Sequence, residues 1–341
     1  MSAAVSQSGA RDRRAHGRLI GALAAAVVAA FLGSLFVGYA GLDVPQAIAD
    51  VAHGAHTLPA IVLVELRLPR ALLGCFVGFS LGLAGAAMQG FLRNPLAEPG
   101  VVGVSGAAAL GAVAAFYSGL SSVVALALPI GGIAGAALGV LLLYALAGRG
   151  AGTMTLILAG VAVNSFAAAL TSLALNLSPN GFAALEIVYW LMGSLIDRSL
   201  PQVWLATPFM ATGWLLLLSA APALDALSLG EPTARSLGFD MRRLRLQLVG
   251  GAALAVGAAV AVSGAIGFIG LVAPHVLRPF VGHRPGRLLF VSGLGGAALL
   301  LVADTAARLL PIRPELKLGV ITALIGAPFL FHLVYRLRRE A

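Results

Sequence analysis

The sequence predicts an all-α, polytopic membrane protein with about ten transmembrane helices. Of its 341 residues, 60% are hydrophobic and only 10% are charged, whereas a soluble domain carries about 25% charged residues. The apolar residues form separate runs, and each is close to the roughly 20 residues that cross a bilayer as a helix. The 43 glycines and 17 prolines interrupt these runs and supply small residues. A water-soluble fold is therefore excluded.

The charge-free intervals place the individual spans. Arginines precede the first run, residues 19–42, which is longer than the roughly 7 to 15 apolar residues of a signal peptide and is predicted to be a retained helix. Single spans are expected at 19–40, 71–92, 155–177, 203–221, 288–303 and 318–335. Residues 99–148 hold two spans, divided at 117–119. Residues 246–277 hold one full span and a short broken one, because glycines and a proline interrupt the second part.

The basic residues predict the orientation. With both termini in the cytoplasm, sixteen arginines lie inside and six basic residues lie outside, in agreement with the positive-inside rule. The domains are then a cytoplasmic tail at 1–18, a transmembrane domain at 19–336 with a cytoplasmic loop at 225–243, and a cytoplasmic tail at 337–341. The six outside residues, which topology does not explain, are Arg67, Arg70, Arg198, Arg308, Arg313 and Lys317.

A weak internal repeat is visible at an offset of 179 residues. Without gaps, 81–103 aligns with 260–282 and superposes Gly85 on Gly264 and Pro95 on Pro274. A shift of five spans would make the two copies run in opposite directions, and inverted repeats are typical of transporters. Two glycine-rich helices can also align by chance, so both interpretations remain open.

Two polar segments are candidates for function. Residues 93–100 carry two prolines that force a loop at a membrane boundary, where Asn94 can bond freed backbone groups. This pattern suits a gate, and an ordinary tight turn is the alternative. In the charged loop 225–243, Glu231 and Pro232 suit the first turn of a short helix and Gly238 its C-terminal cap. Such a helix would present a protruding surface that a cytosolic partner could bind. The alternative is a solvent-exposed loop without a partner.

Other motifs have simpler explanations. Gly74, Gly78 and Gly82 recur every four residues, which favours close helix packing over a ligand groove. His53 and His56 form a surface pair more readily than a metal site. No metal or cofactor site is expected. Asp304 and Arg308, four residues apart, suit a pair on one helix face.

An enzyme is the remaining alternative from residues alone. The tetrapeptide at 103–106, which contains Ser105, has the form used by intramembrane serine proteases, with His275 as a possible base. In a chain so rich in glycine and alanine this match is weak. No phosphate-binding loop of the Walker type is present, so any ATP hydrolysis belongs to another chain.

A series of longer motifs resembles a known family. These motifs are Arg67-Leu-Pro-Arg70, Gly85-Ala-Ala-Met-Gln-Gly90, Asn94-Pro-Leu-Ala-Glu-Pro-Gly100, Tyr189-Trp-Leu-Met-Gly193, Ala234-Arg-Ser-Leu-Gly238, the run 264–278, Ala303-Asp304 with Ala307-Arg308, and Gly319-Val-Ile-Thr-Ala with Gly326-Ala-Pro328. The chain resembles, from about the second span to its C-terminus, the FecCD-like permeases of type II ABC importers for ferric siderophores, heme and cobalamin.

The resemblance implies an architecture and partners. It implies a ten-helix, non-enzymatic permease that forms a homodimer in the bacterial inner membrane, with two cytoplasmic ATP-binding subunits and a periplasmic substrate-binding protein. It implies no nucleic-acid partner. A ferric siderophore is the expected substrate, with cobalamin or heme as alternatives in the same class. An ion-coupled carrier is a distant alternative, because mid-span ionisable residues are almost absent.

The resemblance also assigns residues. Outward-facing arginines of the family dock acidic lobes of the binding protein, and Arg67, Arg70 and Arg308 match those positions. Asn94, Leu96, Thr153 and Met154 match the cytoplasmic gate, although Met154 is bulkier than the small polar residue expected there. The loop that couples to the ATPase matches Leu229, Gly230, Glu231, Ala234, Arg235, Leu237 and Gly238.

Overall fold

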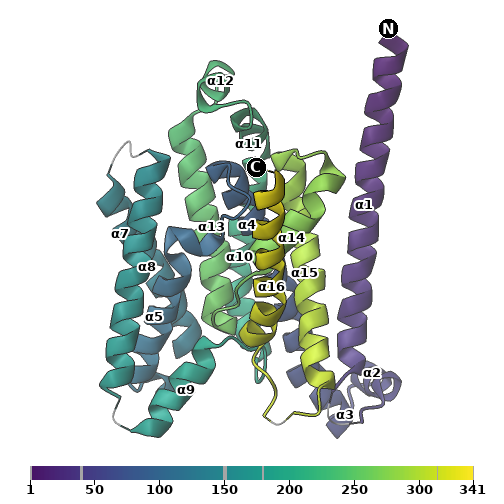
Figure 1. Ribbon diagram of the computed structural model, residues 1–341. Coiled ribbons are helices and arrows are strands. Elements are labelled where there is room, and N and C mark those ends of the chain that lie inside the picture. The colour runs from purple at the N-terminus through teal and green to yellow at the C-terminus, as the bar shows by residue number, and fades with distance from the viewer. Residues whose placement is uncertain (1, 39–40, 149–151, 179, 313, 341) are drawn as a thin grey trace.

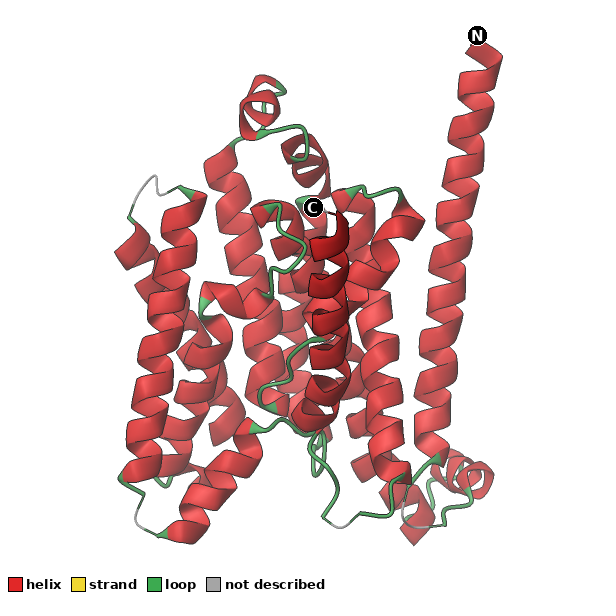
Figure 2. Cartoon of the chain, in the orientation of Figure 1, coloured by secondary structure: helices red, strands yellow, loops and turns green. Residues whose placement is uncertain are grey.

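The structure is a computed structural model, and it describes residues 2–38, 41–148, 152–178, 180–312 and 314–340. Over these residues the chain is a bundle of helices without strands (Figures 1 and 2). The helices are α1 (Ser2–Phe36), α2 (Val44–Ala52), α3 (Leu58–Ile61), α4 (Leu68–Leu92), α5 (Val104–Tyr117), α6 (Leu120–Val123), α7 (Ala127–Ala147), α8 (Thr153–Asn176), α9 (Gly181–Leu191), α10 (Leu200–Ser219), α11 (Ala221–Leu227), α12 (Glu231–Ser236), α13 (Met241–Ser263), α14 (Ile269–Leu277), α15 (Pro285–Leu309) and α16 (Leu318–Glu340). A π-helical turn, η1 (Val62–Arg67), and two 3-10 turns, η2 (Pro99–Val102) and η3 (Arg278–Val281), complete the elements.

The ten expected spans are confirmed as helices. They correspond to α1, α4, α5, α7, α8, α10, α13, α14, α15 and α16. Within the described residues, seven helical stretches are long and apolar enough to cross a membrane, while α5, α14 and the apolar part of α16 (Leu318–Leu333) are shorter apolar helices. As expected, α13 is followed by an irregular segment at 264–268 and then by the short α14. The eleven-residue α9 was not predicted.

The N-terminal residues continue the first span. Since α1 begins at Ser2, the tail predicted at 1–18 is helical from its second residue. Asp12 of α1 forms an ion pair of 2.8 Å with Arg287, near the start of α15. Met1, Arg149, Arg313 and Ala341, which belong to the predicted tails and charge pattern, lie outside the described residues.

Close packing of small residues holds the centre together. The most apolar windows of α4 and α13 are each 78% buried, whereas that of α1 is 11% buried. A Cβ atom on Gly78 would lie 2.4 Å from Gly296 O of α15, and one on Gly82 would lie 2.1 Å from Ser292 O. These backbones touch, so the packing interpretation of the glycine stripe is confirmed.

The repeat at an offset of 179 does not pair equivalent positions. Gly85 lies inside α4, whereas Gly264 follows the end of α13. Helices α4 and α13 nevertheless run in opposite directions through the bundle (Figure 1). The ungapped alignment at an offset of 179 is therefore in the wrong register, because matching the ends of the two helices, Leu92 and Ser263, needs an offset of 171.

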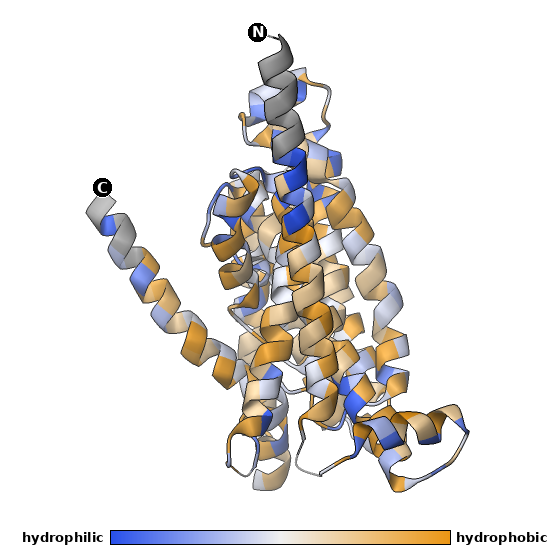
Figure 3. Cartoon of the chain, turned by 90° about the vertical axis from the view of Figure 1, so that its right-hand side faces the viewer, coloured by the Kyte–Doolittle hydropathy of each residue, from blue (hydrophilic) through white to orange (hydrophobic). Residues whose placement is uncertain are grey.

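The two ends of the bundle differ. Helix α12 and both ends of the chain point to one end, and α2 and α3 lie at the other (Figure 1). Helix α16 leans away from the body of the bundle (Figure 3). Its start is anchored by α9: Leu318 N–H donates to Gly193 O at 3.0 Å, and Gly319 N–H donates to Met192 O at 3.1 Å. The motif at 189–193 thus ends where the residues after α9 are hydrogen-bonded to the start of α16.

Candidate functional site

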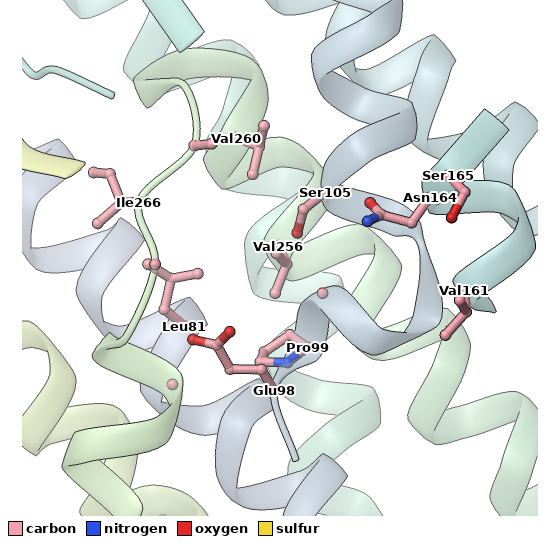
Figure 4. Close-up of a pocket in the computed structure, with 14 residues that line it drawn as sticks. Leu81, Glu98, Pro99, Ser105, Val161, Asn164, Ser165, Val256, Val260 and Ile266 are labelled. Carbon is pink, nitrogen blue, oxygen red and sulfur yellow. The ribbon is translucent and has the colours of Figure 1, made fainter. Parts of the chain in front are cut away.

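A central cavity of about 450 Å³ lies where the irregular segments meet α8. Polar atoms come from Glu98 beside η2, Ser105 of α5, and Asn164 and Ser165 of α8, as Figure 4 shows. Apolar side chains from α4 and α13 and the backbone of 265–267 complete the lining. Asn164 and Ser165 are exposed although they lie inside a membrane-length helix, which indicates that this face of α8 borders a polar space.

Glu98 joins the two irregular segments across this cavity. Its carboxylate Oε1 accepts a hydrogen bond of 2.8 Å from the N–H of Phe268. Phe268 has a left-handed backbone with φ of 67° and immediately precedes α14. A carboxylate is favoured here because the first N–H groups of a helix lack internal acceptors. The Phe268 ring in turn touches Gly326 of α16, where a Cβ would lie 2.2 Å from Phe268 Cγ.

The four predicted gate residues lie on two separate segments. Asn94 and Leu96 follow α4, and the Asn94 side chain turns back to accept a 2.9 Å hydrogen bond from Leu96 N–H. Thr153 and Met154 form the first turn of α8, and Met154 is 68% exposed. The two segments meet further along, where a Cβ on Gly103 would lie 2.6 Å from the Gly160 O of α8. The pairing of the four residues as a gate stays a prediction.

The loop 225–243 contains the short helix α12, with the boundaries that Glu231-Pro232 and Gly238 predicted. Glu231 forms ion pairs with Arg235 at 2.7 Å and with Arg245 of α13 at 3.3 Å. Gly230 and Gly238 have φ values of 108° and 89°, which only glycine adopts easily.

The surface of this loop differs from the expected one. Ala234 has no exposed surface, whereas Leu229 and Leu237 are 67% and 59% exposed. The prediction of the protruding surface is therefore corrected: its accessible residues are Leu229, Arg235 and Leu237. Ala234 instead closes the turn, since its N–H donates to Gly230 O and its carbonyl accepts from Phe239 N–H.

The arginine cluster, Arg67, Arg70 and Arg308, lies at the end of the bundle that carries α2 and α3. It borders a second cavity of about 480 Å³, here called the arginine cavity. The three residues are more enclosed than outward-facing arginines would be. Arg67 is 6% and Arg308 7% exposed, and the Arg70 side chain is 13% exposed.

Each arginine of the cluster already has partners. Arg70 forms a bidentate pair with Asp304, with contacts of 2.8 to 3.0 Å, and also bonds Glu315 in the loop before α16. Arg308 pairs with Asp304 at 3.0 Å, as the spacing of four predicted, and donates to two carbonyls near the end of α1. Arg67 donates to Leu35 O at 2.6 Å. The cluster is therefore an internal network as well as a candidate docking surface.

The residues considered for a protease and for a metal site do not form a shared site. Ser105 borders the central cavity, whereas His275 is not among its lining residues and packs its ring edge-on against Phe329, with centroids 5.2 Å apart. His53 Nδ1 donates to Ala49 O at 2.6 Å. Among the described residues, no group of three or more histidine, cysteine or acidic side chains is placed to hold a metal ion.

Some site residues were missed at the sequence level. Glu98 and Gln89 stand in the quoted motifs, but neither had an assigned partner. Gln89 is 2% exposed, accepts from Arg278 of η3 and donates to Gly270 O at 3.4 Å. Asn164 could have been noticed as an amide inside an apolar run. Glu315 carries no local signal, because its partner Arg70 is 245 residues away.

Comparison with known proteins identifies the family. The model of the FecCD transport family matches residues 26–336. The chain belongs to this family. A cobalamin import permease (BtuC) of Halobacterium salinarum is 42% identical over 84% of this chain and 76% of its own length. A ferric dicitrate permease (FecD) of Escherichia coli is 42% identical over 81% of this chain and 86% of its own length. An iron-citrate import permease (YfmD) of Bacillus subtilis is 35% identical over 94% of this chain and 96% of its own length.

A solved structure supports the same assignment for the fold of this FecCD permease. A chain described as a metal-chelate-type ABC transporter in an inward-facing conformation superposes with a TM-score of 0.81. It is 31% identical, and the match covers 94% of this permease and 99% of that chain. The protein is thus a multi-pass ABC importer permease.

The Glu98 bond gives a first testable prediction. Replacing Glu98 by alanine leaves the half-buried Phe268 N–H without its acceptor, and losing a hydrogen bond to a charged group costs about 1.5–3 kcal/mol. Glu98→Ala is therefore expected to lower the melting temperature of the purified permease in detergent. Glu98→Gln retains a carbonyl acceptor and should lie near the wild type, as should Glu186→Ala at an exposed position of α9. An alanine variant that melts like the wild type would show that this bond stabilises nothing.

Proposed function

We propose that this chain is the membrane subunit of an ATP-driven importer that moves a ferric siderophore from a periplasmic binding protein to the cytoplasm. Two copies form the translocation unit, and two separate ATP-binding subunits supply the energy. The observation that carries the proposal is the family match over nearly the whole chain, with relatives named for iron citrate and cobalamin. Both termini and the loop 225–243 face the cytoplasm of the inner membrane.

The chemistry of the central cavity supports passage of an intact chelate. Its polar groups are one carboxylate, one amide and two hydroxyls, and the carboxylate already accepts a backbone hydrogen bond. Neutral hydroxyl and amide groups can exchange bonds with a polar molecule as it passes. They do not form the anionic ligand set that would strip Fe³⁺ from its chelator. The exposed face of α8, with Asn164 and Ser165, then borders the pathway between the two copies.

The other residues predicted from the sequence are assigned to the two ends of this pathway. Asn94 and Leu96, with Thr153 and Met154, close it at the cytoplasmic end. Helix α12 fits into the ATP-binding subunit through Leu229, Arg235 and Leu237, while Glu231 holds the helix to α13 through Arg245. The arginine cluster receives acidic side chains of the binding protein, because the guanidinium fork bonds carboxylates bidentately.

The test is ATP-dependent uptake into proteoliposomes that contain this permease with its ATP-binding and binding-protein partners. Labelled ferric siderophore, heme and cobalamin are compared, and accumulation of the ferric siderophore alone is expected. Uptake of cobalamin or heme instead would correct the substrate and keep the importer. Uptake that persists without ATP and depends on an ion gradient would overturn the ATP-driven mechanism.

A further inference from the structure

The arginine cavity contains an acidic side chain of the permease itself, bonded to an arginine that an acidic side chain of a docking partner would contact. Besides the three arginines, it is lined by Glu315 and Lys317 from the loop before α16, and by Asp197. The Glu315 side chain is 8% exposed and bonds Arg70 through both carboxylate oxygens. The cavity therefore already contains a carboxylate on its own arginine.

The donors of Arg70 are nearly all in use. Its Nε and Nη2 bond Asp304, and its Nη1 and Nη2 bond Glu315. A guanidinium group has five N–H groups, so these contacts engage four of them and leave one on Nη1. An incoming carboxylate cannot form a bidentate pair with Arg70 while both internal partners remain.

The two internal carboxylates differ in how firmly they are held. Asp304 lies within α15, is 1% exposed and bridges Arg70 and Arg308. Glu315 lies between α15 and α16, outside any helix, and in the part of the chain that the structure describes its side chain bonds only Arg70. Of the two, Glu315 is the one that can leave without breaking a helix or unpairing a second arginine.

We propose that Glu315 occupies, in the undocked permease, the position on Arg70 that a carboxylate of the docking protein takes over. Docking is then an exchange of carboxylates rather than the filling of an empty site. This inference rests on the proposed docking role of the arginine cluster. It adds a partner chemistry: an acidic side chain long enough to enter the cavity and replace Glu315.

Displacement of Glu315 would also affect the helices to which its loop is connected. Glu315 precedes Lys317, whose ammonium lies 5.5 Å from the centre of the Tyr189 ring, and then Leu318, whose N–H is bonded to Gly193 O. Displacing Glu315 releases the loop that leads directly into α16. Docking outside therefore acts on the helix whose Gly326 packs against Phe268, which Glu98 bonds at the central cavity.

The first experiment measures docking affinity with the permease complex in nanodiscs and the soluble binding protein that supports uptake. Glu315→Gln removes the competing charge and keeps the side-chain shape. It is expected to lower the Kd about tenfold, which is about 1.4 kcal/mol, because docking no longer has to break a charged pair. Glu186→Gln, at an exposed position of α9, should leave the Kd unchanged. An unchanged or higher Kd for Glu315→Gln overturns the exchange.

A third variant separates this inference from the docking proposal on which it rests. Arg70→Lys keeps a cation beside Asp304 but loses the planar fork, so it should raise the Kd if Arg70 takes part in docking. Wild-type affinity for Arg70→Lys would remove the docking role itself. Weaker binding by Arg70→Lys, together with no gain for Glu315→Gln, would remove the exchange alone.

A second measurement needs no partner. Phenylglyoxal modifies accessible guanidinium groups, and peptide mapping by mass spectrometry reports the rate at Arg70. In the purified permease, Glu315→Gln should raise this rate several-fold, while the rate at Arg308, held by Asp304 and two carbonyls, stays the same. An equal rate at Arg70 in both proteins would show that Glu315 does not shield it, and would overturn the proposal.

Discussion

Replacing Arg70 by methionine is expected to lower the melting temperature of the permease sharply, because two buried carboxylates then lose their shared cation. The Asp304 side chain is 2% exposed and that of Glu315 is 8% exposed. Removing one partner of a buried ion pair costs about 3–5 kcal/mol, since the remaining charge stays out of water. Arg308 remains beside Asp304 at 3.0 Å but does not reach Glu315 through any hydrogen bond that the described structure contains. Thermal unfolding in detergent, followed by size-exclusion chromatography, measures the loss.

Two further variants make this result specific. Arg198 directly follows Asp197, which lines the arginine cavity, and among the described residues its Nε donates to Ser194 O at 3.3 Å. Arg198→Met should therefore change the melting temperature little. Adding Glu315→Gln to Arg70→Met should recover part of the stability, because the carboxylate that lost its arginine is gone while Asp304 keeps its ion pair with Arg308. A double variant as unstable as Arg70→Met would locate the loss in packing instead of charge.

Replacing both Leu229 and Leu237 by aspartate is expected to abolish uptake and the co-purification of ATP-binding subunits, while the permease stays folded. The two side chains are 67% and 59% exposed, so they contribute little to the packing of the chain itself. Anchoring residues at the centre of an interface often cost 2 kcal/mol or more when removed, and two of them together cost roughly a thousandfold in affinity. Pull-down of the ATP-binding subunits and uptake assays measure the two effects.

The matched control is Leu177→Asp, directly after α8. The C-terminal end of α8 lies at the end of the bundle opposite α12 (Figure 1). Leu177 is also 59% exposed, so it receives the same charge at the same exposure. It should retain the ATP-binding subunits. If the Leu229 and Leu237 variant also retains them and still supports uptake, α12 is not the coupling element.

The sequence was sufficient for the spans and for the boundaries of α12, because both depend on local properties. A helix crosses the membrane wherever about 20 apolar residues occur together, and Pro232 and Gly238 mark the ends of α12 through their own backbone preferences. It was not sufficient for α9, whose eleven residues are too few for a span. It also failed for the register of the repeat, because glycine and proline matches alone do not show where α4 and α13 end.

The same distinction applies to the candidate site. The sequence by itself determined that the chain is a membrane protein of ten apolar helices, and which motifs carry its polar residues, since hydrophobic length and charge position can be read along the chain. Only the tertiary structure decided the partners. Glu98 meets Phe268 across 170 residues, and Arg70 meets Glu315 across 245. Such pairs form because a bilayer and a packed core leave charged groups no water to bond, so each must find a distant partner that local sequence does not specify.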